Sequence, residues 1–129
     1  MKRSFGFRPA TPTTILASCL AISALCGSTE MARAQDIGAG KTLYIDNCQR
    51  CHGNKGQGGV GKKLEGDAAY WDFDIFKRAV MTGIDDEGKK MKTMPVFGTV
   101  GLTKPKGAKP TDDDLHNLQA YLKTFGPAE

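Results

Sequence analysis

Cysteine is scarce in this sequence. Four cysteines occur among 129 residues, and two of them, Cys19 and Cys26, lie near the amino terminus, so that only Cys48 and Cys51 remain in the body of the chain. A small scaffold held together by several disulfides is therefore excluded, because two cysteines form at most one bridge. The short length also excludes a multidomain enzyme.

Long apolar stretches and strand patterns are missing as well. The longest apolar run, residues 15–25, is about half of the roughly 20 residues that a membrane span needs. No segment alternates polar and apolar residues over the length of a strand, and no internal repeat occurs. We therefore expect an all-α domain, with no membrane span after the first 34 residues.

The first 34 residues have the layout of a secretory signal peptide. Basic residues precede the apolar run, and small residues end the segment at Ala32-Arg33-Ala34. We predict cleavage after Ala34, which leaves residues 35–129 as a single exported domain, periplasmic in a bacterium. A membrane anchor, a lipoprotein signal ending at Cys19 and a twin-arginine signal are the alternatives.

An excess of charge of one sign is absent from this domain. Of the 18 Lys and Arg residues, four lie in residues 1–34 together with one of the 14 Asp and Glu residues, so the net charge of +4 falls to +1 for the rest. A protein that binds nucleic acid through a basic surface is therefore not expected.

Helical periodicity marks three segments, residues 36–47, 73–81 and 111–125. Between them, residues 53–66 are rich in glycine, and residues 93–110 are rich in both proline and glycine. Loops of this length are unusual in so small a domain. We therefore expect a prosthetic group to fill the centre and to complete a small core.

Gly40 indicates how the first and last helices meet. It shares one helix face with Ile37, Tyr44 and Cys48, at three- and four-residue steps. Glycine inside a helix costs about 1 kcal/mol relative to alanine, which makes sense where another backbone passes close by. The expected partner is the last helix, which begins at Thr111. Its apolar stripe consists of Leu115, Leu118, Tyr121, Leu122 and Phe125.

The strongest chemical signal is the sequence Cys48-Gln49-Arg50-Cys51-His52. On helical turns Cys51 and His52 follow Cys48 by three and four residues, so that both thiols and the imidazole face one flat object. This pattern is the one that attaches a c-type haem covalently.

Three alternatives use the same residues. A zinc site would need His116 as its fourth ligand, far along the chain. A thioredoxin-like dithiol normally lies at the start of a helix that follows a strand. Cys48 and Cys51 instead lie at the end of a helix. A structural disulfide across so short a loop would gain little closure entropy. We therefore favour haem attachment.

Over residues 35–125 the sequence resembles the small class I c-type cytochromes. The resemblance implies the cytochrome c fold, in which three main helices and long irregular loops wrap around one covalently bound haem c. It implies Cys48 and Cys51 as the thioether cysteines and His52 as the proximal ligand of the iron. The positions where this family crosses its terminal helices are matched by Gly40, Tyr44, Leu118 and Tyr121.

Two further stretches carry the resemblance. Residues 94–97, Met-Pro-Val-Phe, look like the loop of the distal ligand, which implies Met94 as the second axial ligand. Residues 61–66 match a family stretch that often reads Gly-Pro-x-Leu-x-Gly, with Lys62 in the place of the proline. The resemblance also implies that the Lys62 carbonyl accepts a hydrogen bond from the second ring nitrogen of His52.

Other side chains near the motif have competing roles. Met81 continues the apolar stripe of the middle helix and is expected in the core, whereas Met91, among lysines, is expected to be exposed. Tyr70 and Trp71 are expected either to donate to a haem propionate or to cover the core. His116 falls off the stripe of the last helix, and we expect it to be exposed and without a role.

The resemblance implies an electron-transfer protein and not an enzyme. An iron with two axial ligands has no vacant position for a substrate, and the sequence shows no arrangement typical of hydrolytic or phosphate chemistry. We expect a monomer that cycles Fe(III)/Fe(II) between an exported dehydrogenase or membrane complex and an oxidase or reductase. The alternatives are a cytochrome subunit of a larger dehydrogenase, with residues 104–110 as a contact loop, or a haem sensor, ligand-binding or peroxidatic protein with an open distal position.

Charge is expected to steer the redox partners. The lysines expected around the haem edge are Lys55, Lys62, Lys63, Lys89, Lys90, Lys92, Lys104, Lys106 and Lys109. The acidic residues expected at the opposite pole are Asp72, Asp74, Asp85, Asp86, Glu87, Asp112, Asp113 and Asp114. An ordinary solvated surface is the alternative.

Overall fold

The computed structural model describes residues 34–126, so almost all of the expected signal peptide lies outside the described residues. The helices are α1 (Ile37–Asn47), α2 (Gln49–His52), the 3-10 helix η1 (Ala68–Tyr70), α3 (Phe73–Thr82), α4 (Phe97–Val100) and α5 (Asp112–Lys123). These residues form no strand, only an isolated bridge between Ile84 and Lys90. The expected all-α fold is confirmed.

Side-chain caps fix the starts of α1 and α5. Asp36 accepts a hydrogen bond from the Ala39 N–H at 2.9 Å. At α5, the Thr111 hydroxyl accepts from the Asp114 N–H at 3.1 Å, and the Asp114 carboxylate accepts from the Thr111 N–H at 2.9 Å. This reciprocal pair satisfies two amide groups that have no partner within the helix.

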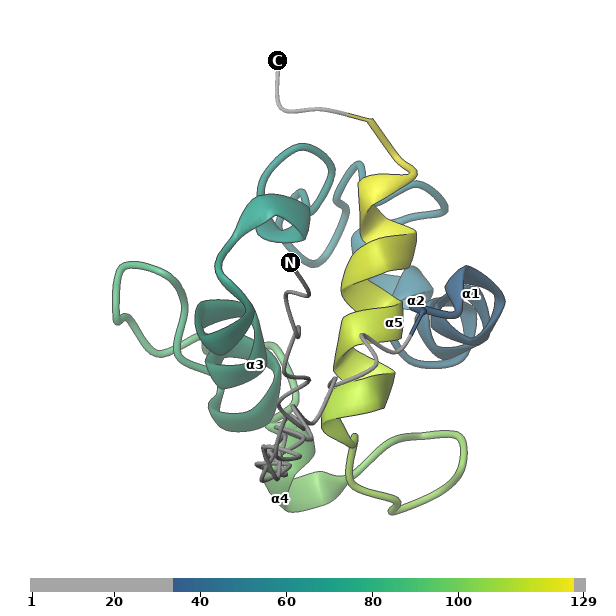
Figure 1. Ribbon diagram of the computed structural model, residues 1–129. Coiled ribbons are helices and arrows are strands. Elements are labelled where there is room, and N and C mark those ends of the chain that lie inside the picture. Colours follow the sequence, from purple (N-terminus) through teal and green to yellow (C-terminus); the bar gives the residue numbers. More distant parts are fainter. Residues whose placement is uncertain (1–33, 127–129) are drawn as a thin grey trace, which may run out of the picture. The chain divides into compact units, whose positions relative to one another are not determined.

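The two terminal helices cross at Gly40. Figure 1 shows α5 between α1 on one side and α3 on the other. A β-carbon on Gly40 would lie only 2.0 Å from the Asn117 carbonyl oxygen, so the backbones touch at this point. The Asn117 side chain also accepts from the Asp36 N–H at 2.7 Å. Gly40 and Tyr44 are buried as expected, but Ile37 is 49% exposed.

Replacing Gly40 with alanine should destabilise the fold, because overpacking against a backbone atom this close should cost about 3 kcal/mol, the upper end of the usual range. The gain of about 1 kcal/mol in helix propensity offsets only part of this cost, so the net loss should be about 2 kcal/mol. Gly38→Ala is the matched control on the same helix, because Gly38 is exposed and a β-carbon there would meet only the flexible Asp36 side chain at 3.2 Å. Equal losses in the two variants, measured by denaturant unfolding, would contradict the close crossing.

Three short elements are not predicted by periodicity. α2, η1 and α4 each span four residues or fewer, which is too short to show a helical repeat. The segment 93–110, which the sequence predicts to be a loop, contains the short helix α4. Gly98 holds α4 against α3, since a β-carbon there would lie 2.4 Å from the Met81 carbonyl oxygen.

The core leaves a hollow centre. The buried apolar residues come from α1, η1, α3, α4, α5 and the segment between α4 and α5. Those of α3 and α4, together with Leu118 and Leu122 of α5, line one side of a cavity of about 410 Å³. No helix within residues 34–126 has the length and apolar character that crossing a bilayer requires.

Candidate functional site

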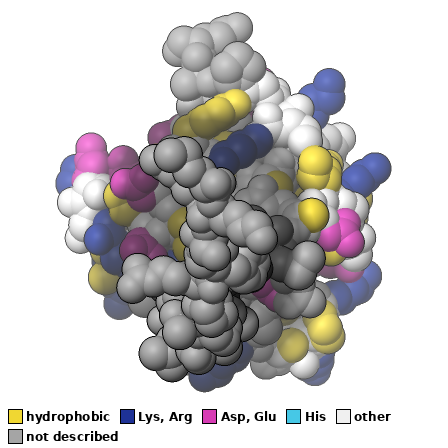
Figure 2. Space-filling view, in the orientation of Figure 1, with side chains coloured by type: hydrophobic (Ala, Val, Ile, Leu, Met, Phe, Trp, Pro, Cys, Tyr) yellow, Lys and Arg dark blue, Asp and Glu magenta, His cyan; other side chains and the backbone are white. Residues whose placement is uncertain are grey.

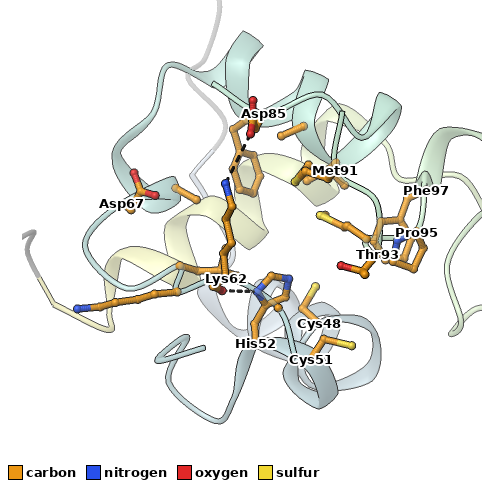
Figure 3. Close-up of a pocket in the computed structure, with 18 of the residues that line it drawn as sticks. Cys48, Cys51, His52, Lys62, Asp67, Asp85, Met91, Thr93, Pro95 and Phe97 are labelled. Carbon is orange, nitrogen blue, oxygen red and sulfur yellow. Dashed lines mark hydrogen bonds and ion pairs between the residues drawn. The ribbon is translucent and has the colours of Figure 1, made fainter. Parts of the chain in front are cut away.

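The cavity brings together segments that are far apart in the sequence (Figure 3). Its apolar wall includes Phe76, Val80, Phe97, Leu118 and Leu122. Most of the remaining lining comes from the Cys-x-x-Cys-His motif, residues 60–64 and the loop between α3 and α4, and further residues come from the end of α1 and from the region of η1. A cavity of this size with an apolar wall and a few polar groups is typical of a cofactor site.

Both cysteines of the motif line this cavity as free thiols. Cys48 follows α1 directly and is partly buried, whereas Cys51 lies in α2 and is exposed. Burial, and after it the neighbouring Cys51, raises the pKa of the Cys48 thiol to about 12. A thioredoxin-like pair begins a helix that follows a strand. Here Cys48 follows the end of α1, and residues 34–47 form no strand, so this alternative is disfavoured.

His52 is held in one orientation. Its side chain is buried, and Nδ1 lies 2.7 Å from the Lys62 carbonyl oxygen. A carbonyl only accepts hydrogen bonds, so Nδ1 must carry the proton and donate. Nε2 then keeps a free lone pair, which is the form of histidine that binds a metal. The hydrogen bond expected at Lys62 is thus present.

Gly61 contributes a contact that the sequence did not single out. A β-carbon at this position would lie 2.7 Å from Cε1 and 2.8 Å from Nδ1 of His52, so only glycine lets the backbone rest against the imidazole. The Gly61 N–H donates to the Cys51 carbonyl at 2.8 Å, which ties this segment to the motif. The glycine that begins the stretch 61–66 was the available signal.

Two methionines reach the cavity, although only one was expected. Met94 lines it and packs against the buried core. Met91 also lines the cavity and is partly buried, so the expectation that it is exposed is wrong. Its N–H is anchored to the Gly83 carbonyl at 2.7 Å, which draws it inward. Met81 packs against the core and does not line the cavity, as expected.

The two aromatic candidates separate. Trp71 lines the cavity, and its Nε1–H donates to the Asp67 carboxylate at 3.0 Å. Tyr70 is half exposed, does not line the cavity, and donates to the Gly126 carbonyl at 3.2 Å. Of the two, only Trp71 remains a candidate neighbour of a cofactor.

His116 is not the free surface residue that we expected. Its ring stacks on Phe73 with a centroid distance of 3.5 Å and an interplanar angle of 8°, and the residue is only partly exposed. It does not line the cavity. Among residues 34–126, no three or more His, Cys, Asp or Glu side chains are placed to hold a metal ion. The zinc alternative is therefore disfavoured.

The residues around the cavity fit a covalently bound haem. Cys48 and Cys51 present sulfur at one rim, and His52 offers Nε2 because its other nitrogen is engaged. Figure 3 shows the loop that carries Met91 and Pro95 on the other side of the cavity from His52. An imidazole and a thioether are a known axial pair for haem iron.

A family model and a curated relative agree with this fit. A family model described as cytochrome c oxidase, cbb3-type, subunit III matches residues 35–122. Cytochrome c-554(547) of Halothiobacillus neapolitanus is 31% identical over 94 residues, which cover 71% of this chain and 99% of that protein. The crystal structure of cytochrome CL from Methylophaga aminisulfidivorans covers 68% of this chain, with 19% identity and a TM-score of 0.42. This chain spans about half, 53%, of the length of cytochrome CL.

Proposed function

The chain belongs to the class I c-type cytochromes, electron-transfer proteins with covalently bound haem c, and we propose that it is a periplasmic electron carrier. In this role it takes single electrons from an exported dehydrogenase or a membrane complex and passes them to an oxidase or reductase. The proposal includes export through a cleaved signal peptide, residues 1–34, and a monomeric domain, residues 35–129.

The observation that carries the proposal is that an oriented imidazole and a thioether line the same cavity. His52 is fixed by the Lys62 carbonyl at 2.7 Å with Nε2 free, and Met94 lies in the wall of the same cavity. With both axial positions taken, a substrate would find no open site on the iron. This arrangement supports electron transfer over a sensor or peroxidatic protein, which needs a vacant distal position.

Each residue of the site has a distinct task in this proposal. Cys48 and Cys51 would tether the haem through thioether bonds, which would prevent its loss outside the cytoplasm. His52 and Met94 would hold the iron, and a thioether ligand would favour the reduced state relative to a second nitrogen ligand. Bound there, the haem supplies reversible one-electron exchange. The apolar wall excludes water and so limits reorganisation when the charge changes.

Partner docking involves the rim of the cavity. Five of the nine lysines expected near the haem edge line it, namely Lys62, Lys63, Lys89, Lys90 and Lys92. Three aspartates, Asp67, Asp85 and Asp86, line it as well, so Asp85 and Asp86 do not form an opposite pole. Figure 2 shows basic and acidic side chains side by side at the left edge of the visible face. The lysines remain in excess at the rim, and we propose an acidic partner surface.

Small redox reagents of opposite charge test this docking surface. The rate at which hexacyanoferrate(III) oxidises the reduced protein should fall by about threefold or more between low ionic strength and ~0.15 M, because salt screens its attraction to the rim. Oxidation by the cation tris(phenanthroline)cobalt(III) should not fall. Lys92→Gln should weaken the salt effect, and Lys109→Gln, away from the cavity, is the control.

If both reagents showed the same salt response, the proposed basic docking surface would be wrong. Co-purification with a larger complex that persists at high salt would instead indicate a permanent cytochrome subunit. The loop of residues 104–110 would then be the candidate contact with that complex. The N–H groups of residues 103 and 104 donate to the Asn47 side chain at 2.7 and 3.3 Å and hold the start of this loop beside α1.

A further inference from the structure

Asp85 is a buried carboxylate in the wall of the cavity that the proposed mechanism does not use. The residue is 4% exposed, although it lies in the loop after α3 and is followed by the exposed Asp86 and Glu87. Its Oδ2 lies 3.6 Å from the Lys62 ammonium, and the Lys62 side chain is 79% exposed whereas that of Asp85 is 6% exposed. The pair is thus asymmetric, with the anion inside and the cation largely in water.

The loop around Asp85 fixes the position of the carboxylate. Its Oδ1 accepts a hydrogen bond from the Lys89 N–H at 2.7 Å, and the Asp85 carbonyl accepts from the Arg78 guanidinium at 2.6 Å. The Lys89 N–H first, and then the Lys62 ammonium, hold the pKa of the Asp85 carboxyl below its usual value despite burial. Asp85 is therefore a fixed negative charge at neutral pH.

Lys62 connects this charge to the axial ligand. Its backbone carbonyl accepts the hydrogen bond from His52 Nδ1, and its side chain crosses to Asp85, as both dashed lines in Figure 3 show. The position that often carries proline in related proteins thus carries a cation in this chain. A proline could not make the ion pair.

We propose that Asp85 lowers the reduction potential of the bound haem and that Lys62 partly offsets this effect. The inference rests on the proposed function. The couple gains one electron and no proton on reduction, so the oxidised state is more positive by one unit of charge. A fixed anion in the cavity wall stabilises that state. Lys62 acts in the opposite direction but more weakly, because solvent screens its ammonium.

Neutralising each partner should shift the potential in opposite directions. In equilibrium redox titrations of the intact haem protein, Asp85→Asn should raise the potential by up to about 59 mV, which corresponds to about tenfold in the equilibrium constant of a one-electron couple. Lys62→Gln should lower it by a smaller amount. Lys62→Arg keeps the positive charge and should leave the reduction potential at the value of the unaltered protein.

Matched controls change the same charges at positions that do not line the cavity. Glu87→Gln alters an exposed carboxylate of the same loop, and Lys55→Gln alters an exposed lysine. Both should shift the potential much less. If the ion pair only supported the structure, both substitutions would shift the reduction potential in the same direction. Both would also change the absorption of the iron–methionine bond.

The outcomes separate this inference from the proposed function. Opposite shifts at Asp85 and Lys62, with Asp85→Asn the larger, support the inference. Shifts of one sign, or shifts no larger than those of the controls, overturn it while leaving an electron carrier in place. If Asp85→Asn fails to accumulate with haem, Lys62→Gln decides by itself, and an unchanged potential overturns the inference. Absence of haem from the unaltered protein would instead refute the proposed function.

Discussion

Replacing both Cys48 and Cys51 with serine is expected to abolish covalent haem attachment completely. A serine hydroxyl cannot form the thioether, and the two thiols lie together at the rim of the cavity. The haem should then separate from the polypeptide on denaturation, which a haem stain of a denaturing gel or an intact mass measures directly. The variant should also be much less stable, because the prosthetic group completes a small core.

The matched control for this experiment is Arg50→Ala. Arg50 lies between the two cysteines in α2, is exposed, and does not line the cavity. The Arg50→Ala variant should still carry one covalently attached haem per chain. Haem that stays bound through denaturation in the double serine variant would show that the attachment involves other atoms.

Replacing Met94 with alanine is expected to open the distal side of the iron. The reduced variant should bind carbon monoxide rapidly and stoichiometrically at neutral pH, whereas the unaltered protein should resist binding because a thioether occupies that position. Its reduction potential should also fall, since loss of the thioether removes a ligand that favours the reduced iron. Absorption spectroscopy under carbon monoxide measures the first effect, and a redox titration measures the second.

Met91→Ala is the sharpest control for Met94, because both methionines line the same cavity. Met94 packs against the buried core and is followed by Pro95, which favours an extended backbone at residue 94. Met91→Ala should therefore retain resistance to carbon monoxide. If Met91→Ala opens the iron and Met94→Ala does not, then Met91 is the axial ligand. If only the double variant opens it, the two thioethers can replace each other.

Local chemistry made most of the site predictable from the sequence. The spacing of Cys48, Cys51 and His52 requires no knowledge of the fold, because the three residues lie on adjacent helical turns. Gly40 was similarly informative, since glycine inside an apolar helix face has few explanations other than a close crossing. The same applies to Thr111, whose capping role follows from the acidic residues after it.

The remaining features depend on contacts that sequence periodicity does not reveal. Asp85 reads as part of a solvated charge run, but it is buried, and it accepts hydrogen bonds from the Lys89 N–H and the Arg78 guanidinium. Met91 reads as exposed among lysines, but its N–H is drawn to Gly83. His116 was assigned to solvent because the stripe of α5 excludes it, and the stacking partner Phe73 lies on another helix.

The intact mass and the absorption spectrum of the exported protein test the central claim most directly. Produced in a host that attaches c-type haem, the protein should have the mass of residues 35–129 plus one haem. Its visible spectrum should change reversibly on reduction and reoxidation by one electron per chain. A colourless product with the mass of the bare polypeptide would contradict the account.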